Sequence, residues 1–462
     1  MKLLDTIAAI STPIGKGGVA MIRISGNDAL SIGDKIFRRK GGQALSSAQA
    51  TKMVYGQIID TETGISVDDG MAVTFRAPCS FTGEDVVEIY CHGGLLVTRK
   101  VLSCVFVAGA RPAEAGEFTR RAFLLGKLGL SEAEALGNLL EASNEMQMRL
   151  ARGGMRGHLS AKTSEIYDNL RAIMAGIYAA IDFPDEDLNE YSREDISRTV
   201  RNAISEIDKL ISTYSSGRAV AQGISTVICG KANAGKSSVY NRILGYDAAI
   251  VTDIKGTTRD VLREAASFGG VTLNLCDTAG LRQTDDTVES IGIERALTAL
   301  EGAELALAVF DVSAPLEDED GFLIDRLSEF GKVCIALLNK SDLGVCRQSE
   351  EYIRSHFDKC VEICADTGSG FDKLADTVGK TFFDGNIDID NDAVVVGARQ
   401  YASLTVAREA LFESFELLQR DVPLDLCCVG IEAAMSEVAQ VDGREIGEDI
   451  VSEIFSKFCV GK

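Results

Sequence analysis

The stretch Gly230-Lys231-Ala232-Asn233-Ala234-Gly235-Lys236-Ser237 decides the fold of the middle of this chain. It matches the phosphate-binding pattern GxxxxGK[ST]. The apolar segment 224–229 before it predicts a strand, and helical periodicity begins near Ser237. In that context, backbone N–H groups and the start of a helix converge on phosphate oxygens. We therefore expect Lys236 to reach the β- and γ-phosphates of a nucleotide and the Ser237 hydroxyl to coordinate Mg²⁺.

Two further segments, in the expected order, specify the nucleotide. Asp277-Thr278-Ala279-Gly280 follows the apolar segment 273–276, and Asn339-Lys340-Ser341-Asp342 follows the segment 332–338. Asp277 is placed to hold Mg²⁺ through water, and the N–H of Gly280 to sense the γ-phosphate. Asp342 is placed to accept hydrogen bonds from guanine N1–H and the N2 amine, which selects GTP over ATP by roughly 10⁴-fold.

A fourth segment, Gly256-Thr257-Thr258-Arg259-Asp260, predicts a switch loop in which one threonine hydroxyl ligates Mg²⁺ only when the γ-phosphate is present. The residue that orients the attacking water is less evident, because Leu281 stands where Ras-like proteins carry a glutamine. An aliphatic side chain cannot do this. Spacing alone leaves five polar candidates open: Arg282, Gln283, Asp285, Asp286 and Glu289.

Hydrophobic patterning divides the chain into four stretches. Short alternating apolar segments up to about Arg121 predict a mixed α+β domain. From about Ser131, apolar residues at helical spacing predict amphipathic helices. From Gly223 onward, strands alternate with helices, which predicts a mainly parallel sheet covered by helices. Helical periodicity returns after about Gly385, so we expect a nucleotide domain inserted into a discontinuous helical domain.

Composition indicates several ordered intracellular domains. The chain has 462 residues, of which 46% are hydrophobic and 25% charged, and this length favours two to four domains. We expect no membrane span and no secretory leader, hence a cytoplasmic location. Twelve cysteines without CxxC spacing indicate reduced thiols. The net charge of −22 requires any RNA contact to be local, and three basic clusters are candidates for it: 38–40, 120–121 and 149–156.

Beyond the nucleotide motifs, several segments carry a family resemblance. They are Gly17-Gly18-Val19 with Arg23-Ile24-Ser25-Gly26, Phe81-Thr82-Gly83-Glu84-Asp85, His92-Gly93-Gly94, Ala115-Gly116-Glu117-Phe118, Ile181-Asp182-Phe183-Pro184-Asp185 and Phe458-Cys459-Val460-Gly461-Lys462. With them, the chain resembles the MnmE (TrmE) family of tRNA-modification GTPases along essentially its whole length.

The resemblance implies a multidomain protein of α/β and all-α parts. These are an α+β tetrahydrofolate-binding and dimerisation domain at 1–121, a helical domain at 122–222 and 385–462, and an inserted Ras-like P-loop GTPase domain at 223–384. It also implies a homodimer that works with tRNA and an MnmG-type partner carrying FAD. The implied reaction uses 5,10-methylenetetrahydrofolate, with 5-formyltetrahydrofolate as an analogue, to build a (carboxymethyl)aminomethyl group at C5 of the wobble uridine (U34).

The resemblance also assigns site residues. Catalysis falls to Glu289, which positions the attacking water indirectly, with Thr258 and Lys236. Mg²⁺ would be held by Ser237 and Thr258, and a stimulating K⁺ by Asn233, Thr252, Ile254 and Thr257. Folate contacts fall on Arg23, Glu88, Lys127 and Lys462. The GTP-binding set is Asn233, Ala234, Gly235, Lys236, Ser237, Ser238, Thr252, Asp253, Ile254, Lys255, Gly256, Thr257, Thr258, Asp277, Thr278, Ala279, Gly280, Asn339, Lys340, Asp342, Cys364, Ala365 and Asp366.

Some positions depart from the family pattern or stay open. Ala232 replaces a common proline, and Cys364-Ala365-Asp366 stands where Ser-Ala-Lys or Ser-Ala-Arg is usual, which puts a side-chain contact to guanine in doubt. Cys459 is a poor match to a prenylation signal and is a candidate either for the one-carbon chemistry or for simple burial. A ribosome-assembly GTPase and a regulatory GTPase without modification chemistry are the alternative functions. The first should carry a basic RNA-binding domain, and the second should bind no folate.

Overall fold

The computed structural model describes residues 5–182, 192–246, 263–276, 300, 302–329, 331–383, 387–420, 422–445 and 447–461. They divide into two compact units, one of residues 1–137 with 439–462 and the other of residues 138–438. Each unit is built around a sheet of its own.

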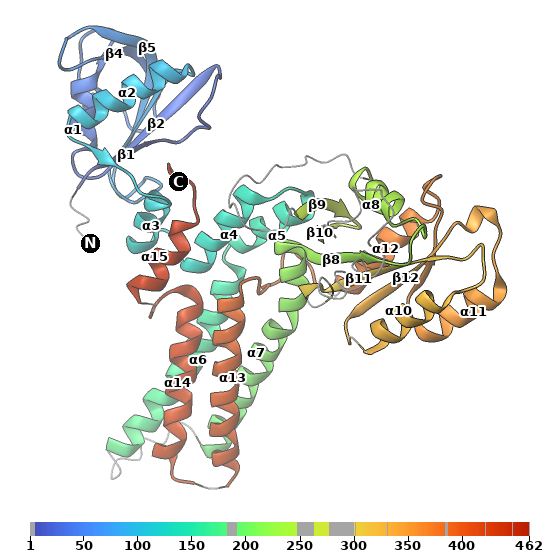
Figure 1. Ribbon diagram of the computed structural model, residues 1–462. Helices are drawn as coiled ribbons and strands as arrows, with labels where there is room; N and C mark the ends of the chain where they lie inside the picture. Colours follow the sequence, from blue (N-terminus) through green and yellow to red (C-terminus); the bar gives the residue numbers. More distant parts are fainter. Residues whose placement is uncertain are drawn as a thin grey trace. The chain divides into compact units, whose positions relative to one another are not determined.

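A seven-stranded mixed sheet forms the centre of the first unit (Figure 1). Its spatial order is β3-β4-β5-β6-β2-β1-β7, and every neighbouring pair is antiparallel except β1 with β7. Helices α1 (Ala29–Ile36) and α2 (Leu95–Val107) pack on this sheet through one apolar cluster. The strands are β1 Ile7–Ile10, β2 Val19–Ser25, β3 Phe37–Arg39, β4 Val54–Ile59, β5 Ser66–Phe75, β6 Val86–His92 and β7 Arg111–Pro112.

The end of the chain returns to this first unit. Helix α15 (Glu448–Ser456) packs on α3 (Glu117–Leu124) and on the start of α4 (Leu130–Glu141), with Phe455 at the centre of a small apolar cluster. The hydroxyl of Ser131 donates to the carbonyl of Val441 at 2.9 Å. The first unit is thus closed by residues that are separated by more than 300 positions in the sequence.

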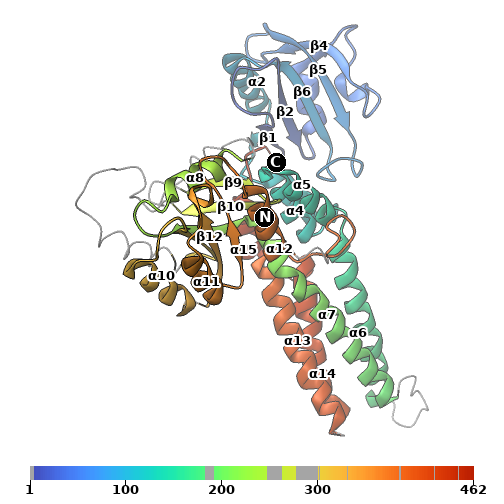
Figure 2. The same cartoon turned by 90° about the vertical axis from the view of Figure 1, so that its right-hand side faces the viewer.

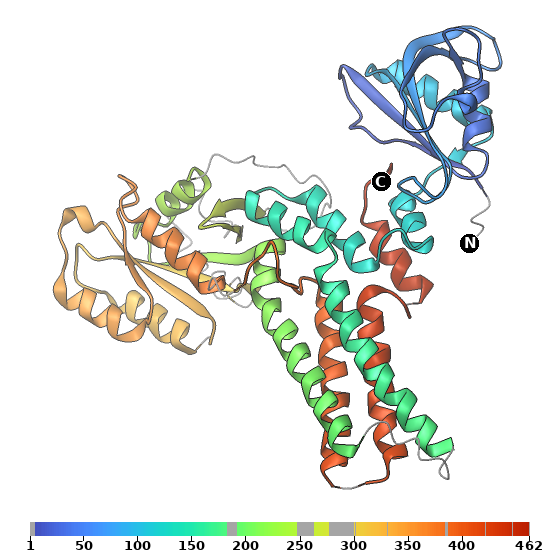
Figure 3. The same cartoon turned by 180° about the vertical axis from the view of Figure 1, so that it is seen from behind.

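Long helices make up one part of the second unit. Four of them run side by side in Figures 1 and 3: α6 (His158–Asp182), α7 (Arg193–Gln222), α13 (Ala398–Gln419) and α14 (Leu424–Asp442). Helix α7 begins with a capping box between Ser192 and Asp195, the chemistry that fixes a helix start. The backbones of α13 and α14 approach closely at Gly430, where a Cβ would collide with the Ser414 hydroxyl. The shorter α5 (Glu145–Met155) contacts both α6 and α7.

The other part of the second unit is a six-stranded sheet in the order β13-β12-β11-β8-β10-β9, parallel except for its edge strand β9 (Figure 2). It directly follows α7, since β8 begins at Ile224. The strands are β8 Ile224–Cys229, β9 Arg263–Phe268, β10 Val271–Cys276, β11 Leu305–Asp311, β12 Val333–Asn339 and β13 Cys360–Glu362.

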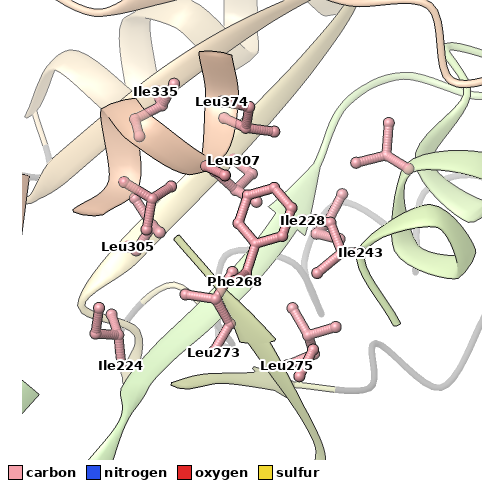
Figure 4. Close-up of a cluster of buried hydrophobic side chains, with 14 of the residues drawn as sticks. Ile224, Ile228, Ile243, Phe268, Leu273, Leu275, Leu305, Leu307, Ile335 and Leu374 are labelled. Carbon is pink, nitrogen blue, oxygen red and sulfur yellow. The ribbon is translucent and has the colours of Figure 1, made fainter. Parts of the chain in front are cut away.

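Helices cover both faces of this sheet, because successive side chains point to opposite faces and the central strands are apolar at nearly every position. One face packs Ile228, Leu307 and Phe268 against α8 (Lys236–Leu244) and α12 (Phe371–Phe382), as Figure 4 shows for part of the cluster. The other face packs Val227 and Phe310 against α10 (Asp318–Glu329) and α11 (Arg347–His356). The strands and the parallel sheet that the hydrophobic pattern predicted between 223 and 384 are therefore confirmed within the described residues.

Two further findings concern the chain as described. Within the described ranges, no helix has the length and apolar character needed to span a bilayer. All twelve cysteines are free thiols, and half of them are buried.

Candidate functional site

The loop between β8 and α8 has the tight backbone that a phosphate-binding loop requires. Gly230 lies at φ 151° and Gly235 at φ 102°, and a Cβ at these positions would collide with the Val309 carbonyl and with the Asn339 amide, respectively. Asn233 adopts a left-handed conformation at φ 59°, which is uncommon for a residue with a side chain. Helix α8 begins at Lys236, one residue before the predicted start.

The Lys236 side chain lies back over this loop. Its Nζ donates to the carbonyls of Gly230 and Lys231, at 2.8 and 2.7 Å. Burial lowers the pKa of Lys236, against weaker opposing effects of Cys229 and Glu319. Ser237, the predicted Mg²⁺ ligand, is exposed in the first turn of α8, and Ser238 beside it is half-buried. Among the described residues, the hydrogen-bond partners of this partly desolvated cation are thus backbone dipoles and not carboxylates.

Asn339, at the end of β12, connects the phosphate-binding loop to the segment 364–366. Its side chain is 2% exposed, its Nδ2 donates to the Ala234 carbonyl at 2.8 Å, and its Oδ1 accepts from the N–H of Ala365 at 3.1 Å. Removing this amide would leave buried backbone groups without partners, which costs about 1–3 kcal/mol for each group. Asn339 therefore holds together the two segments that the sequence assigned to phosphate and base.

The residues after Asn339 turn sharply. Lys340 has φ 60°, and its Nζ forms an ion pair with Asp311 at 2.6 Å. Burial raises the pKa of Asp311, but hydrogen bonds from Lys340 and Ser313 hold it below its ordinary value. Asp342 lies exposed in the short helical turn Ser341–Leu343. The structure thus places the predicted base-reading carboxylate at the end of a strand, open to an incoming ligand.

Segment 364–366 is held by backbone bonds and by one arginine. Cys364 pairs with Ser369 in an isolated bridge, and the Cys364 and Ala365 side chains are buried while Asp366 is exposed. The guanidinium of Arg242, in α8, donates to the carbonyls of Ala365 and Asp366. Sequence analysis missed Arg242, because an arginine in a helix gives no sign of which loop it will meet.

A second missed pair lies on the other side of the loop. The Nζ of Lys231 forms an ion pair at 3.0 Å with Asp320 in α10, a carboxylate that is 1% exposed. Burial lowers the pKa of Lys231, but Asp320 and Glu317 raise it above its ordinary value overall. Lys231 occupies a position of the motif that any residue can take, so the motif does not predict its ion pair with Asp320.

Several predicted residues lie outside the described part of the chain: Thr252, Asp253, Ile254, Lys255, Gly256, Thr257, Thr258, Asp277, Thr278, Ala279, Gly280, Glu289 and Lys462. Strand β10, which ends at Cys276, leads directly into the segment that begins with Asp277. Their assigned roles remain predictions.

In the first unit, two of the residues assigned to folate form an ion pair. Arg23 on β2 lies opposite Glu88 on β6, with Nε and Nη2 each 2.9 Å from Oε1 of Glu88. The other carboxylate oxygen accepts from Tyr90 at 2.8 Å, and burial together with Glu88 raises the pKa of Tyr90 to about 12. The guanidinium also lies 5.6 and 5.7 Å from the ring centres of Phe81 and Phe118.

This arrangement differs from the expectation in one respect. Both oxygens of Glu88 already have partners, so a pterin could pair with them only by sharing or replacing Arg23 and Tyr90. Tyr90 was missed, although it lies two residues after Glu88 and hence on the same face of the strand.

Lys127 and the chain end lie elsewhere in the first unit. Lys127 is exposed, and its Nζ donates to the Pro78 carbonyl at 2.9 Å. Cys459 is exposed, so the burial alternative is wrong. The tail that carries it is tied to the domain, because Val460 pairs with Ala115 and the Ser11 hydroxyl donates to the Gly461 carbonyl at 2.9 Å.

The structure also corrects one candidate RNA patch. Arg121 is 0% exposed and forms ion pairs with Asp5, Glu84 and Glu117, so it cannot contact a phosphate backbone. In the cluster 149–156, Arg149, Arg152 and Arg156 all interact with residue Asp390.

Family models match most of the chain. The model described as "GTP-binding protein TrmE N-terminus" matches residues 6–127, and the "MnmE helical domain" model matches residues 130–459. Among solved structures, a likeness to Era of Aquifex aeolicus bound to GDP and AlF4⁻ has 23% identity and a TM-score of 0.28, covering 40% of this chain and 66% of that one.

Curated relatives match from end to end. The chain is 38% identical over 460 residues to "tRNA modification GTPase MnmE" of Desulforamulus reducens, covering 99% of each. It is also 38% identical over 461 residues to the protein of the same name from Thermoanaerobacter pseudethanolicus, covering 100% of each. The chain therefore belongs to the MnmE, or TrmE, family of tRNA modification GTPases.

Proposed function

We propose that this chain is a potassium-stimulated, cytoplasmic GTP hydrolase that acts as a homodimer in a tRNA-modifying complex. With an MnmG-type partner that carries FAD, it uses 5,10-methylenetetrahydrofolate to add a (carboxymethyl)aminomethyl group at C5 of the wobble uridine. Its domains are those of the family resemblance: folate-binding at 1–121, helical at 122–222 and 385–462, and Ras-like at 223–384.

The observation that carries the nucleotide part is the link through Asn339. This side chain joins the phosphate-binding loop at Ala234 to the segment at Ala365, and the exposed Asp342 follows it by three residues. Phosphate and base can thus be bound by one rigid frame. We expect purified protein, in buffer with potassium and magnesium, to bind GTP at least 10³-fold more tightly than ATP. Equal affinities for the two nucleotides would reject the proposal.

The side chains and backbone at the phosphate-binding loop are suited to bind Mg²⁺ and K⁺, the two cations that the family resemblance implies. Ser237 and Thr258 would hold Mg²⁺, and Asn233, Thr252, Ile254 and Thr257 would hold K⁺. The left-handed backbone at Asn233 and the tight packing of Gly230 and Gly235 against Val309 and Asn339 support a fixed loop conformation at this site. When bound, these ions supply positive charge where negative charge develops during hydrolysis.

Hydrolysis also needs a residue that positions the attacking water, and we assign this role to Glu289. Replacing it with alanine should leave GTP affinity nearly unchanged, because the residue acts on water rather than on the nucleotide. Potassium-stimulated turnover should fall by roughly 10²–10³-fold in steady-state assays. Exposed Glu329 offers a control: Glu329→Ala should turn over GTP like the parent. Unchanged turnover in Glu289→Ala would overturn the assignment.

The folate part is supported by the group around Arg23. The Arg23 guanidinium on β2 contacts the Glu88 carboxylate on β6 and lies near two aromatic rings, and such groups suit a flat, polar pterin and an acidic tail. Lys127 and Lys462 would contribute to binding, and Cys459 is the candidate for the one-carbon chemistry.

Calorimetry with 5-formyltetrahydrofolate tests this site. Glu88→Ala should weaken binding at least tenfold, because it removes a carboxylate and frees Arg23. Glu62→Ala, which removes an exposed carboxylate of the same domain, should bind like the parent. If Glu88→Ala binds as tightly as the parent, the pocket lies elsewhere. Loss of the modified wobble nucleoside in a deletion strain would separate a modification enzyme from a purely regulatory or ribosome-assembly GTPase.

A further inference from the structure

Helix α8 contacts two parts of the predicted nucleotide site. Its first residue, Lys236, lies at the phosphate-binding loop, and its last turn contains Arg242. The Nε and Nη2 of Arg242 each lie 3.2 Å from the Ala365 carbonyl, and Nη2 lies 2.6 Å from the Asp366 carbonyl. One planar guanidinium therefore holds two successive carbonyls of the segment that follows β13.

Arg242 closes a ring of contacts around the site. The phosphate-binding loop is bound to Asn339 through Ala234, Asn339 is bound to Ala365, and Ala365 is bound through Arg242 to the helix that starts at the same loop. The turn after Ala365 follows the guanidinium closely, since a Cβ at Gly368 would lie 3.2 Å from it. A hydrogen bond from Tyr246 to Asp372 fastens the residues after α8 to α12 as well.

We propose that Arg242 is a specificity-determining positioning residue for guanine. Its side chain reaches the nucleotide only through the segment 364–366. The N–H groups of Cys364 and Ala365 donate to Ser369 and Asn339, so we expect the N–H of Asp366 to face guanine O6. Cys364 is buried, and the exposed Asp366 carries a negative charge, so within this segment the side chains offer guanine O6 no cation. By fixing the Ala365 and Asp366 carbonyls, Arg242 sets where the neighbouring N–H groups point. This inference rests on the proposed binding of guanine nucleotide at this site.

The test compares nucleotide affinities of the full chain and an Arg242→Ala variant. Competition with a fluorescent GDP would give dissociation constants for GDP, for 6-thio-GDP, which alters only O6, and for IDP, which lacks the N2 amine read by Asp342. We expect Arg242→Ala to weaken GDP binding about tenfold, the loss typical of hydrogen bonds to a charged group. The preference for GDP over 6-thio-GDP should shrink, while the preference for GDP over IDP should stay as in the parent.

Controls separate positioning from general damage. Asn241→Ala, at the exposed neighbouring position of α8, should bind all three nucleotides like the parent. Arg242→Gln keeps one amide donor and should give an intermediate effect, and it serves as the test if Arg242→Ala does not fold. The proposal is overturned if the variants lose affinity for all three nucleotides by the same factor, or if GDP binding is unchanged. A parent chain that binds no GDP would instead reject the proposed function.

Discussion

Two cations removed from water to different degrees, the buried Arg121 in the first unit and the half-buried Lys236 in the second, have opposite surroundings. Arg121 forms ion pairs with three carboxylates, those of Asp5, Glu84 and Glu117. Within the described residues, the Lys236 ammonium donates its hydrogen bonds to two backbone carbonyls. Burial lowers the pKa of both, but the carboxylates reverse this for Arg121 and raise its pKa, whereas the pKa of Lys236 stays lowered.

The difference separates a structural charge from a charge kept for a ligand. A buried cation whose partners are carboxylates is neutralised by the fold itself, and its removal leaves those carboxylates buried without a counter-charge. A half-buried cation whose hydrogen-bond partners, among the described residues, are backbone carbonyls has much to gain from an anion such as a phosphate. The same kind of residue therefore supports folding in one unit and chemistry in the other.

The largest effect on stability is expected for Arg121→Met. Glu84 and Glu117 would stay buried without this counter-charge, so we expect the free energy of unfolding of the first unit to fall by about 3–5 kcal/mol. Urea unfolding followed by circular dichroism would measure it. The neighbouring Arg120→Met is the matched control. Because Arg120 is only half-buried, this substitution should lower the free energy of unfolding far less. Equal losses of stability in both variants would mean that the ion pairs of Arg121 do not contribute specifically to the stability of the first unit.

Lys236→Met should show the reverse pattern. Transition-state stabilisation by the ammonium would be lost, so GTP turnover should fall by roughly 10²–10³-fold in a phosphate-release assay. The unfolding transition should move little, because burying this charge opposes folding and methionine fills a similar volume. Lys373→Met, at an exposed position in α12, should change neither. A Lys236→Met protein that is as unstable as Arg121→Met would break the comparison.

The smallest expected effect is the loss of stability at acidic pH. Burial raises the pKa of Asp5 and Glu117, but the arginines around them, Arg111 and Arg121, bring both below their ordinary values of 3.8 and 4.5. Their contribution to stability is complete above those ordinary values and is lost as the pH falls through the lowered pKa values of the folded state. We therefore expect stability to fall as the pH drops below about 4.5, by at most about 1.4 kcal/mol per pH unit for each carboxyl group and by less for the partly exposed Asp5. Urea titrations between pH 3 and 6 would test this, and a parent chain with no acid-dependent loss would contradict it.

Sequence reasoning succeeded where one segment carries its own signal. The phosphate-binding loop, the strands around it and the end of β12 at Asn339 follow from a short motif and from continuous apolar segments that alternate with helices. It failed where a contact joins segments that are distant along the chain. The three contacts that Arg121, Arg242 and Lys231 make depend on which elements the fold brings together, and no local pattern encodes this. The Arg23–Glu88 pair is intermediate, because the resemblance supplied both residues and only the strand register showed that they bind each other.

The return of the chain end to the first unit has a consequence for biosynthesis. Residues 439–462 belong to the same compact unit as residues 1–137: Phe455 packs against Leu130 and Ala133, and Gly461 lies against the backbone of Ile10. That unit can therefore reach its final packing only after residues 439–462 have been synthesised, whereas residues 138–438, which form the other unit, are made before them.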